Sequence, residues 1–86
     1  MSLIADMKVF ILRALARMNE IPMPGEQLFQ SVKNVFEPKP LDSEIKTALK
    51  ELEADGFISG VRDDFDAAKF TWTLTEKGTH KARKLN

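Results

Sequence analysis

The sequence predicts a mainly α fold, a single domain of residues 1–86 that carries one small antiparallel β-hairpin. Two observations indicate this class. Apolar side chains recur every three or four residues in three stretches that prolines and glycines separate, as on helices with one buried face. From Phe57 onward they recur at every second residue, which is typical of strands, before a short helical stretch near the end of the sequence.

The first predicted helix covers residues 2–19 and is apolar most of the way round. At about 100° per residue, two adjoining arcs of its surface hold nearly all of its apolar side chains. A helix of this breadth is either central to the fold or shared with a partner. We therefore predict either a homodimer through helix 2–19 or a helix that the rest of the chain surrounds. The apolar side chains are Ile4, Ala5, Met7, Val9, Ile11, Leu12, Ala14, Leu15, Ala16 and Met18.

The second predicted helix follows the break "NEIPMPGEQ". Two prolines and a glycine stop the first helix, and either Pro24 or Gly25 opens the next one, which extends to about Phe36. We expect it to bury Leu28 and Val32 together with either Val35 or Phe36.

A third helix, over residues 43–55, follows the break "EPKPLD". Asp42 or Ser43 is its expected N-cap, and Gly56 follows its end, where a left-handed residue is favoured. Its apolar positions fit the helical repeat fully and are expected to be buried. They are Ile45, Ala48, Leu49 and Leu52.

The segments "FISGVR" and "KFTWTLT" predict the two strands of the hairpin, with Phe70, Trp72 and Leu74 on one face of the second strand. Thr75 then caps a final helix, "EKGTHKARKL". The tip between the strands, "DDFD", is acidic. Each aspartate near a phosphate would lose on the order of 1 kcal/mol, so we do not expect the apex to grip DNA. Turn formation and protection against edge-to-edge pairing account for these aspartates.

Two pieces of the chain resemble a known family. "IKTALKELEADGFISG" (Ile45–Gly60) resembles a recognition helix and first wing strand, and "FTWTLTEKG" (Phe70–Gly78) resembles a second wing strand and the start of the next helix. Both are similar to the winged helix-turn-helix superfamily, in particular PadR-like and MarR-like bacterial transcriptional regulators. The resemblance is strong over Leu41–Leu85. It implies a three-helix core, a wing and a short C-terminal helix, although the tyrosines that PadR-like proteins often carry near the recognition helix are missing.

The outward face of helix 43–55 supplies the main candidate contacts to double-stranded DNA. On a helical wheel, small, hydroxyl-bearing and cationic side chains lie opposite the buried positions. Hydroxyl groups can bond to phosphates or base edges, and ammonium groups to guanine or phosphate. These side chains are Ser43, Lys46, Thr47, Lys50 and Ala54.

Acidic side chains on the same helix complicate this interpretation. The segment Asp42–Gly56 holds five acidic residues and two lysines, a net charge of −3. Glu44 and Glu51 flank the outward face, where they either sit clear of a DNA groove or repel it. A solvated helix surface of mixed charge is the other interpretation of this face.

Further basic residues outside that helix are candidates for phosphate contacts. Arg62 and Lys69 stand at the bases of the hairpin strands, and Lys77 and Lys81 lie on one face of the final helix. Residues 69–86 carry a net charge of +4. That surface could hold phosphates or a partner's acidic face, or it could simply complement the helix macrodipole.

Composition limits the remaining functions. The 86 residues are 43% hydrophobic, enough for one core, and 13 basic residues balance 13 acidic ones, so no overall basic excess indicates nucleic acid. There is no cysteine, and the single histidine, His80, has no ligand at metal spacing. We predict a cytoplasmic protein without catalytic site, metal, cofactor or small-molecule ligand. It is either a DNA-binding regulator or a winged-helix protein-protein interaction module without significant DNA affinity.

Overall fold

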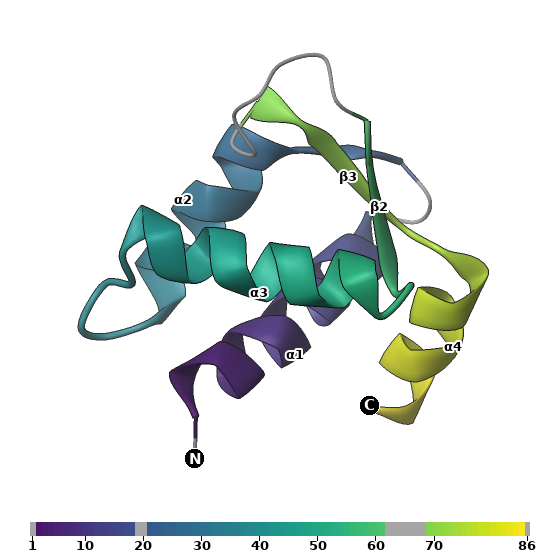
Figure 1. Ribbon diagram of the computed structural model, residues 1–86, viewed down its shortest axis with the longest axis horizontal. Helices are drawn as coiled ribbons and strands as arrows, with labels where there is room; N and C mark the ends of the chain where they lie inside the picture. Colours follow the sequence, from purple (N-terminus) through teal and green to yellow (C-terminus); the bar gives the residue numbers. More distant parts are fainter. Residues whose placement is uncertain (1, 19–20, 62–68, 86) are drawn as a thin grey trace.

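The computed structural model describes residues 2–18, 21–61 and 69–85, which form a mainly helical fold with a small antiparallel sheet (Figure 1). None of the described helices has the length and apolar character needed to cross a membrane. The elements, in chain order, are α1 (Leu3–Arg17), β1 (Met23–Pro24), α2 (Gly25–Val35), α3 (Asp42–Ala54), β2 (Ile58–Val61), β3 (Thr71–Leu74) and α4 (Glu76–Lys84).

The described sheet has three strands in the order β1-β3-β2, one more than the hairpin that the sequence predicts. Trp72 in β3 is opposite Gly60 on one side and Met23 on the other, and both pairings are antiparallel. The β1 strand was missed because two residues are too short to show an alternating pattern, and because Pro24 is a poor strand former. It ties the hairpin to the start of α2.

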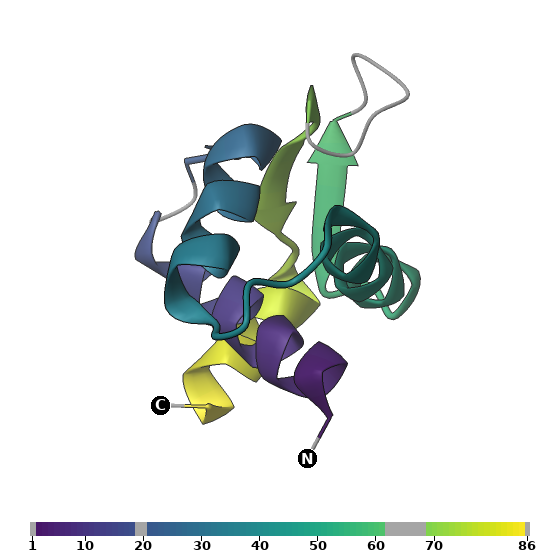
Figure 2. The same cartoon turned by 90° about the vertical axis from the view of Figure 1, so that its left-hand side faces the viewer.

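Helix α1 lies at the centre of the fold, where α2, α3, α4 and β3 all pack against it (Figures 1 and 2). Met7 and Ile11 are completely buried on this helix, and Leu12, Ala14 and Leu15 are nearly so. Contacts within the chain therefore account for most of the unusual apolar breadth of α1. The homodimer through helix 2–19 stays a prediction, but the apolar breadth of the helix is no longer an argument for it.

The start of α3 differs from the expected one. Leu41 occupies the N-cap position, and both Asp42 and Ser43, the two expected caps, lie inside the helix. The carboxylate of Glu44 instead accepts a hydrogen bond from the backbone N–H of Leu41 at 2.8 Å. The Glu44 side chain, three residues after the N-cap, thus accepts the hydrogen bond of the Leu41 backbone N–H, as the second half of a capping box does.

At the end of α2, Phe36 and not Val35 is the side chain that packs against the core. Val35 is 58% exposed, whereas Phe36 packs against the core. The Phe36 ring meets the ring of Phe10 edge-on, with centroids 5.8 Å apart and an interplanar angle of 83°. Phe10 is partly buried, and this aromatic pair covers one side of its ring.

Helix α4 docks closely against the start of β2. The Thr75 hydroxyl accepts a hydrogen bond from the Gly78 N–H at 3.0 Å, which confirms the expected cap, and donates one to the Gly56 carbonyl at 2.5 Å. A Cβ atom at Gly78 would lie only 1.8 Å from the carbonyl oxygen of Phe57. Only glycine permits this approach. Gly56 has the positive φ, 81°, expected after α3.

Candidate nucleic-acid interface

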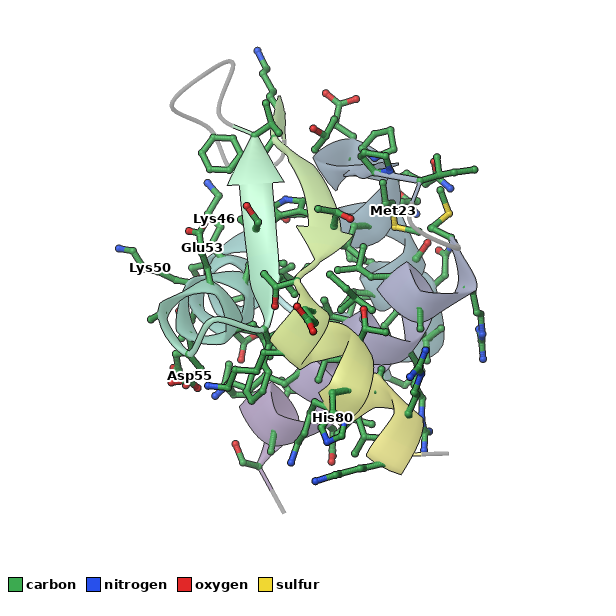
Figure 3. All side chains as sticks on the ribbon, turned by 90° about the vertical axis from the view of Figure 1, so that its right-hand side faces the viewer. Met23, Lys46, Lys50, Glu53, Asp55 and His80 are labelled. Atoms are coloured by element: carbon green, nitrogen blue, oxygen red, sulfur yellow. The ribbon has the colours of Figure 1, made fainter. Side chains whose placement is uncertain are left out.

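The two faces of α3 separate as the helical repeat predicts. Its four expected core positions are 0–2% exposed. The opposite face is exposed, and Figure 3 shows Lys46 and Lys50 extending from the side of α3 that faces away from α1. The exposed side chains are Ser43, Lys46, Thr47, Lys50 and Ala54. The structure thus brings together, on one surface, the five outward positions of helix 43–55 that the sequence indicates.

The acidic residues at the start of α3 are engaged by groups of the protein itself. Asp42 forms an ion pair with Lys33 of α2. The Glu44 carboxylate accepts a hydrogen bond from the backbone N–H of Leu41, as described above. Both carboxylates also lie in the first turn, where the positive end of the helix dipole stabilises them.

The acidic residues in the second half of α3 are drawn toward neighbouring elements. Glu51 forms an ion pair with Lys8 of α1, with 2.5 Å between Nζ and Oε1. Glu53 accepts a hydrogen bond from the backbone N–H of Gly60 at 3.2 Å, so its carboxylate faces β2. Glu51 is thereby oriented toward α1 and away from the outward face, and the geometry favours the interpretation that it sits clear of a groove.

The C-terminal end of α3 is held by a lysine that the sequence placed among the DNA contacts. Lys77 of α4 donates a hydrogen bond to the backbone carbonyl of Asp55 at 2.6 Å, and its Nζ lies 4.7 Å from the centroid of the Phe57 ring. A cation at a helix C-terminus complements the negative end of the dipole. Lys77 thus has a structural partner within the protein.

The charge around α3 is more balanced than its own sequence suggests. Three lysines from other helices, Lys8, Lys33 and Lys77, contact it. Their number equals the excess of acidic residues over lysines in Asp42–Gly56. These pairings could not be predicted from residue spacing, because Lys8 and Glu51 are 43 positions apart and no periodic pattern links them.

The two hydroxyl side chains of the outward face differ in their hydrogen bonding. Thr47 Oγ1 donates to the backbone carbonyl of Ser43 at 2.9 Å, one turn earlier on α3. Such back-bonding is common for threonine in helices and holds the side chain in one rotamer. Ser43 takes part in this bond only through its backbone carbonyl, and its side chain lies in the first turn of α3.

The remaining candidates lie apart from this face. Arg62 and the acidic tip fall outside the described residues, while Lys69 is exposed just before β3. Lys81 is exposed on α4, and Figure 3 places His80 of the same helix at the opposite end of the view from Lys46. A shallow, largely polar groove on α4 has Glu76, Thr79, His80 and Arg83 in its lining. The α4 groove is thus lined by residues 74–83 and not by α3, although Lys77, which also lines it, reaches the end of α3.

Among the described residues, no three acidic or histidine side chains come together as a group that could hold a metal ion. No family model matches the chain, and no similar protein is found among curated proteins or among solved structures.

Proposed function

We propose that the chain is a winged-helix DNA-binding protein, a small transcriptional regulator whose α3 helix enters the major groove of a duplex. Lys46 and Lys50 supply the cationic contacts, and Ser43 and Thr47 lie between phosphates and base edges. Lys69 and Lys81 are secondary candidates for phosphate contacts from outside the helix.

One observation carries the proposal: four acidic side chains of α3 already interact with other groups of the protein. Asp42 and Glu51 pair with lysines, and Glu44 and Glu53 accept backbone hydrogen bonds. Lys46 and Lys50 lie exposed on the outward face. In this proposal the ammonium groups of Lys46 and Lys50 contact the phosphates or guanine bases of a duplex that approaches the outward face.

The scaffold is compatible with such a role. Figure 2 shows α3 and β2 next to one another on one side of the molecule, so a helix and a strand flank the same surface. Polar contacts from α1, α2, β2 and α4 fix α3 at several points along its length. A rigidly held helix positions its side chains more accurately than a mobile one, which benefits recognition.

Duplex binding measured over a range of salt concentrations tests the proposal. Binding through phosphates weakens with salt, with a log–log slope of about −0.9 for each phosphate neutralised. The double variant Lys46→Ala/Lys50→Ala is expected to reduce that slope by about 1 to 2 units, and to raise Kd about tenfold or more at low salt.

A matched control removes the same charge elsewhere. Arg17 ends α1, Lys84 ends α4, and both are exposed. Arg17→Ala/Lys84→Ala changes the net charge by the same amount as the α3 variant, and it should leave most of the affinity and of the slope intact. If both double variants weaken binding equally, only net charge matters, and the assignment of α3 as the reading helix is wrong.

The second candidate is a winged-helix module that binds protein and not DNA. Two large apolar side chains near α3 favour it: Leu41 at the N-cap is 66% exposed, and Val61 at the end of β2 is 54% exposed. The zero net charge of the whole chain points the same way. Absence of duplex binding by the wild-type protein at low salt would favour this candidate over the first.

A further inference from the structure

Thr47 lies on the outward face of α3, about midway along the helix. Ser43 is one turn before it and Lys50 one turn after it, and all three are exposed. Lys46 and Lys50 carry long, flexible side chains on this face, while the side chain of Thr47 is short. A helix that enters the major groove on this face would bring Thr47 near the base edges.

The Thr47 hydroxyl has already used its only proton. Oγ1 donates it to the Ser43 carbonyl at 2.9 Å. A hydroxyl has one donor and two acceptor lone pairs, so no donor remains for the acceptor groups of a base, which are N7 and O6 of guanine, N7 of adenine and O4 of thymine. The bond also turns the oxygen back toward the preceding turn of the helix. The γ-methyl group is the other substituent on Cβ, and it remains available to contact DNA.

We propose that Thr47 determines specificity by placing its γ-methyl against the 5-methyl group of a thymine, and that it does not read DNA as a hydrogen-bond donor. This inference rests on the proposed function. Thymine is the only standard base that presents a methyl group in the major groove. Two methyl groups in contact exclude water from both, and burying a group of that size changes affinity about fourfold.

The test begins with the wild-type protein and a duplex chosen by selection from a randomised library. Each thymine of that duplex is then replaced in turn by deoxyuridine, which lacks only the 5-methyl group. We expect one position at which the replacement weakens wild-type binding about fourfold. The other replacements should have smaller effects.

Two variants assign that effect to Thr47. Thr47→Ser keeps the hydroxyl and removes the γ-methyl, so it should bind thymine and deoxyuridine duplexes equally well. Thr47→Val keeps a methyl group in place and removes the hydroxyl, so it should retain the preference for thymine. Thr73→Ser, in strand β3, is the control for a methyl group removed elsewhere, and it should behave as wild type. Circular dichroism verifies that each variant is folded.

Three outcomes would overturn the inference. The first is equal sensitivity to deoxyuridine in wild type and Thr47→Ser. The second is a selected duplex without a thymine whose methyl group matters. The third is a large loss of affinity in Thr47→Val, because the hydroxyl would then be the reading group. Salt-dependent duplex binding with any of these results leaves the proposed function standing. Failure of the wild type to bind any duplex at low salt overturns both.

Discussion

Replacement of Gly78 by alanine should destabilise the protein, although Gly78 lies within helix α4, where alanine is the better helix former. On helix propensity alone the substitution would stabilise by about 1 kcal/mol. The added Cβ, however, would lie 1.8 Å from the Phe57 carbonyl oxygen and 2.8 Å from its carbonyl carbon. Ordinary carbon–oxygen contacts begin near 3.3 Å. Helix α4 would therefore have to move away from β2 by about 1.5 Å.

That displacement strains the hydrogen bonds by which α4 docks. The N–H of Thr75 donates to the Phe57 carbonyl at 3.1 Å, its hydroxyl donates to the Gly56 carbonyl at 2.5 Å, and Lys77 donates to the Asp55 carbonyl at 2.6 Å. At about 1 kcal/mol each, loss of all three costs roughly 3 kcal/mol. After the gain in propensity, the net loss of unfolding free energy is roughly 2 kcal/mol.

Urea denaturation followed by tryptophan fluorescence measures this change. Trp72 is the single tryptophan of the chain and is 2% exposed, so its emission reports loss of the core. With m-values of about 1–3 kcal/mol/M, the midpoint should fall by about 1 M. Gly56→Ala serves for comparison, because its nearest neighbour is Lys77 Cδ at 3.8 Å and only its φ of 81° resists a side chain. Its cost is about 1 kcal/mol. A Gly78→Ala protein as stable as wild type, or more stable, would show that α4 does not dock against the Phe57 carbonyl as closely as described.

Three further predictions use the same assays. Gly60→Ala would place a Cβ 2.8 Å from Cζ3 of Trp72; it should cost about 1–3 kcal/mol and shift the tryptophan emission, and an unchanged spectrum would contradict the close contact. Leu49→Ala, at a core position that is 1% exposed, should lower the unfolding free energy by about 2–5 kcal/mol, and a smaller loss would mean that α3 is less tightly packed than described. Lys77→Met should cost about 1 kcal/mol by removing the bond to Asp55, without altering the salt slope of duplex binding; a slope reduced by about 0.9 would show that Lys77 contacts phosphate.

The local features of α3 and its neighbours could be predicted from residue types and their spacing alone. The positions of Ile45 and Leu49 in the core, the left-handed Gly56 and the Thr75 cap all follow from interactions between residues at most four apart. Helical periodicity and cap chemistry depend on residues close together in the chain, so the spacing of residue types predicts them directly. The same periodicity identified the outward face of α3 and hence the candidate contacts.

The surroundings of that face depend on how the elements pack and could not be predicted in this way. The pairing of β1 with β3, the ion pair between Lys8 and Glu51, and the engagement of Lys77 at the end of α3 join residues far apart in the chain. Such partners depend on how the elements pack, and many arrangements of charges are compatible with one helical pattern. The net charge of −3 on Asp42–Gly56 argued against DNA as long as α3 was considered alone. Packing adds lysines of three other helices around α3. Lys33 and Lys8 pair with Asp42 and Glu51, and Lys77 bonds to the backbone carbonyl of Asp55, so residues distant in the sequence partly compensate the charge of the helix.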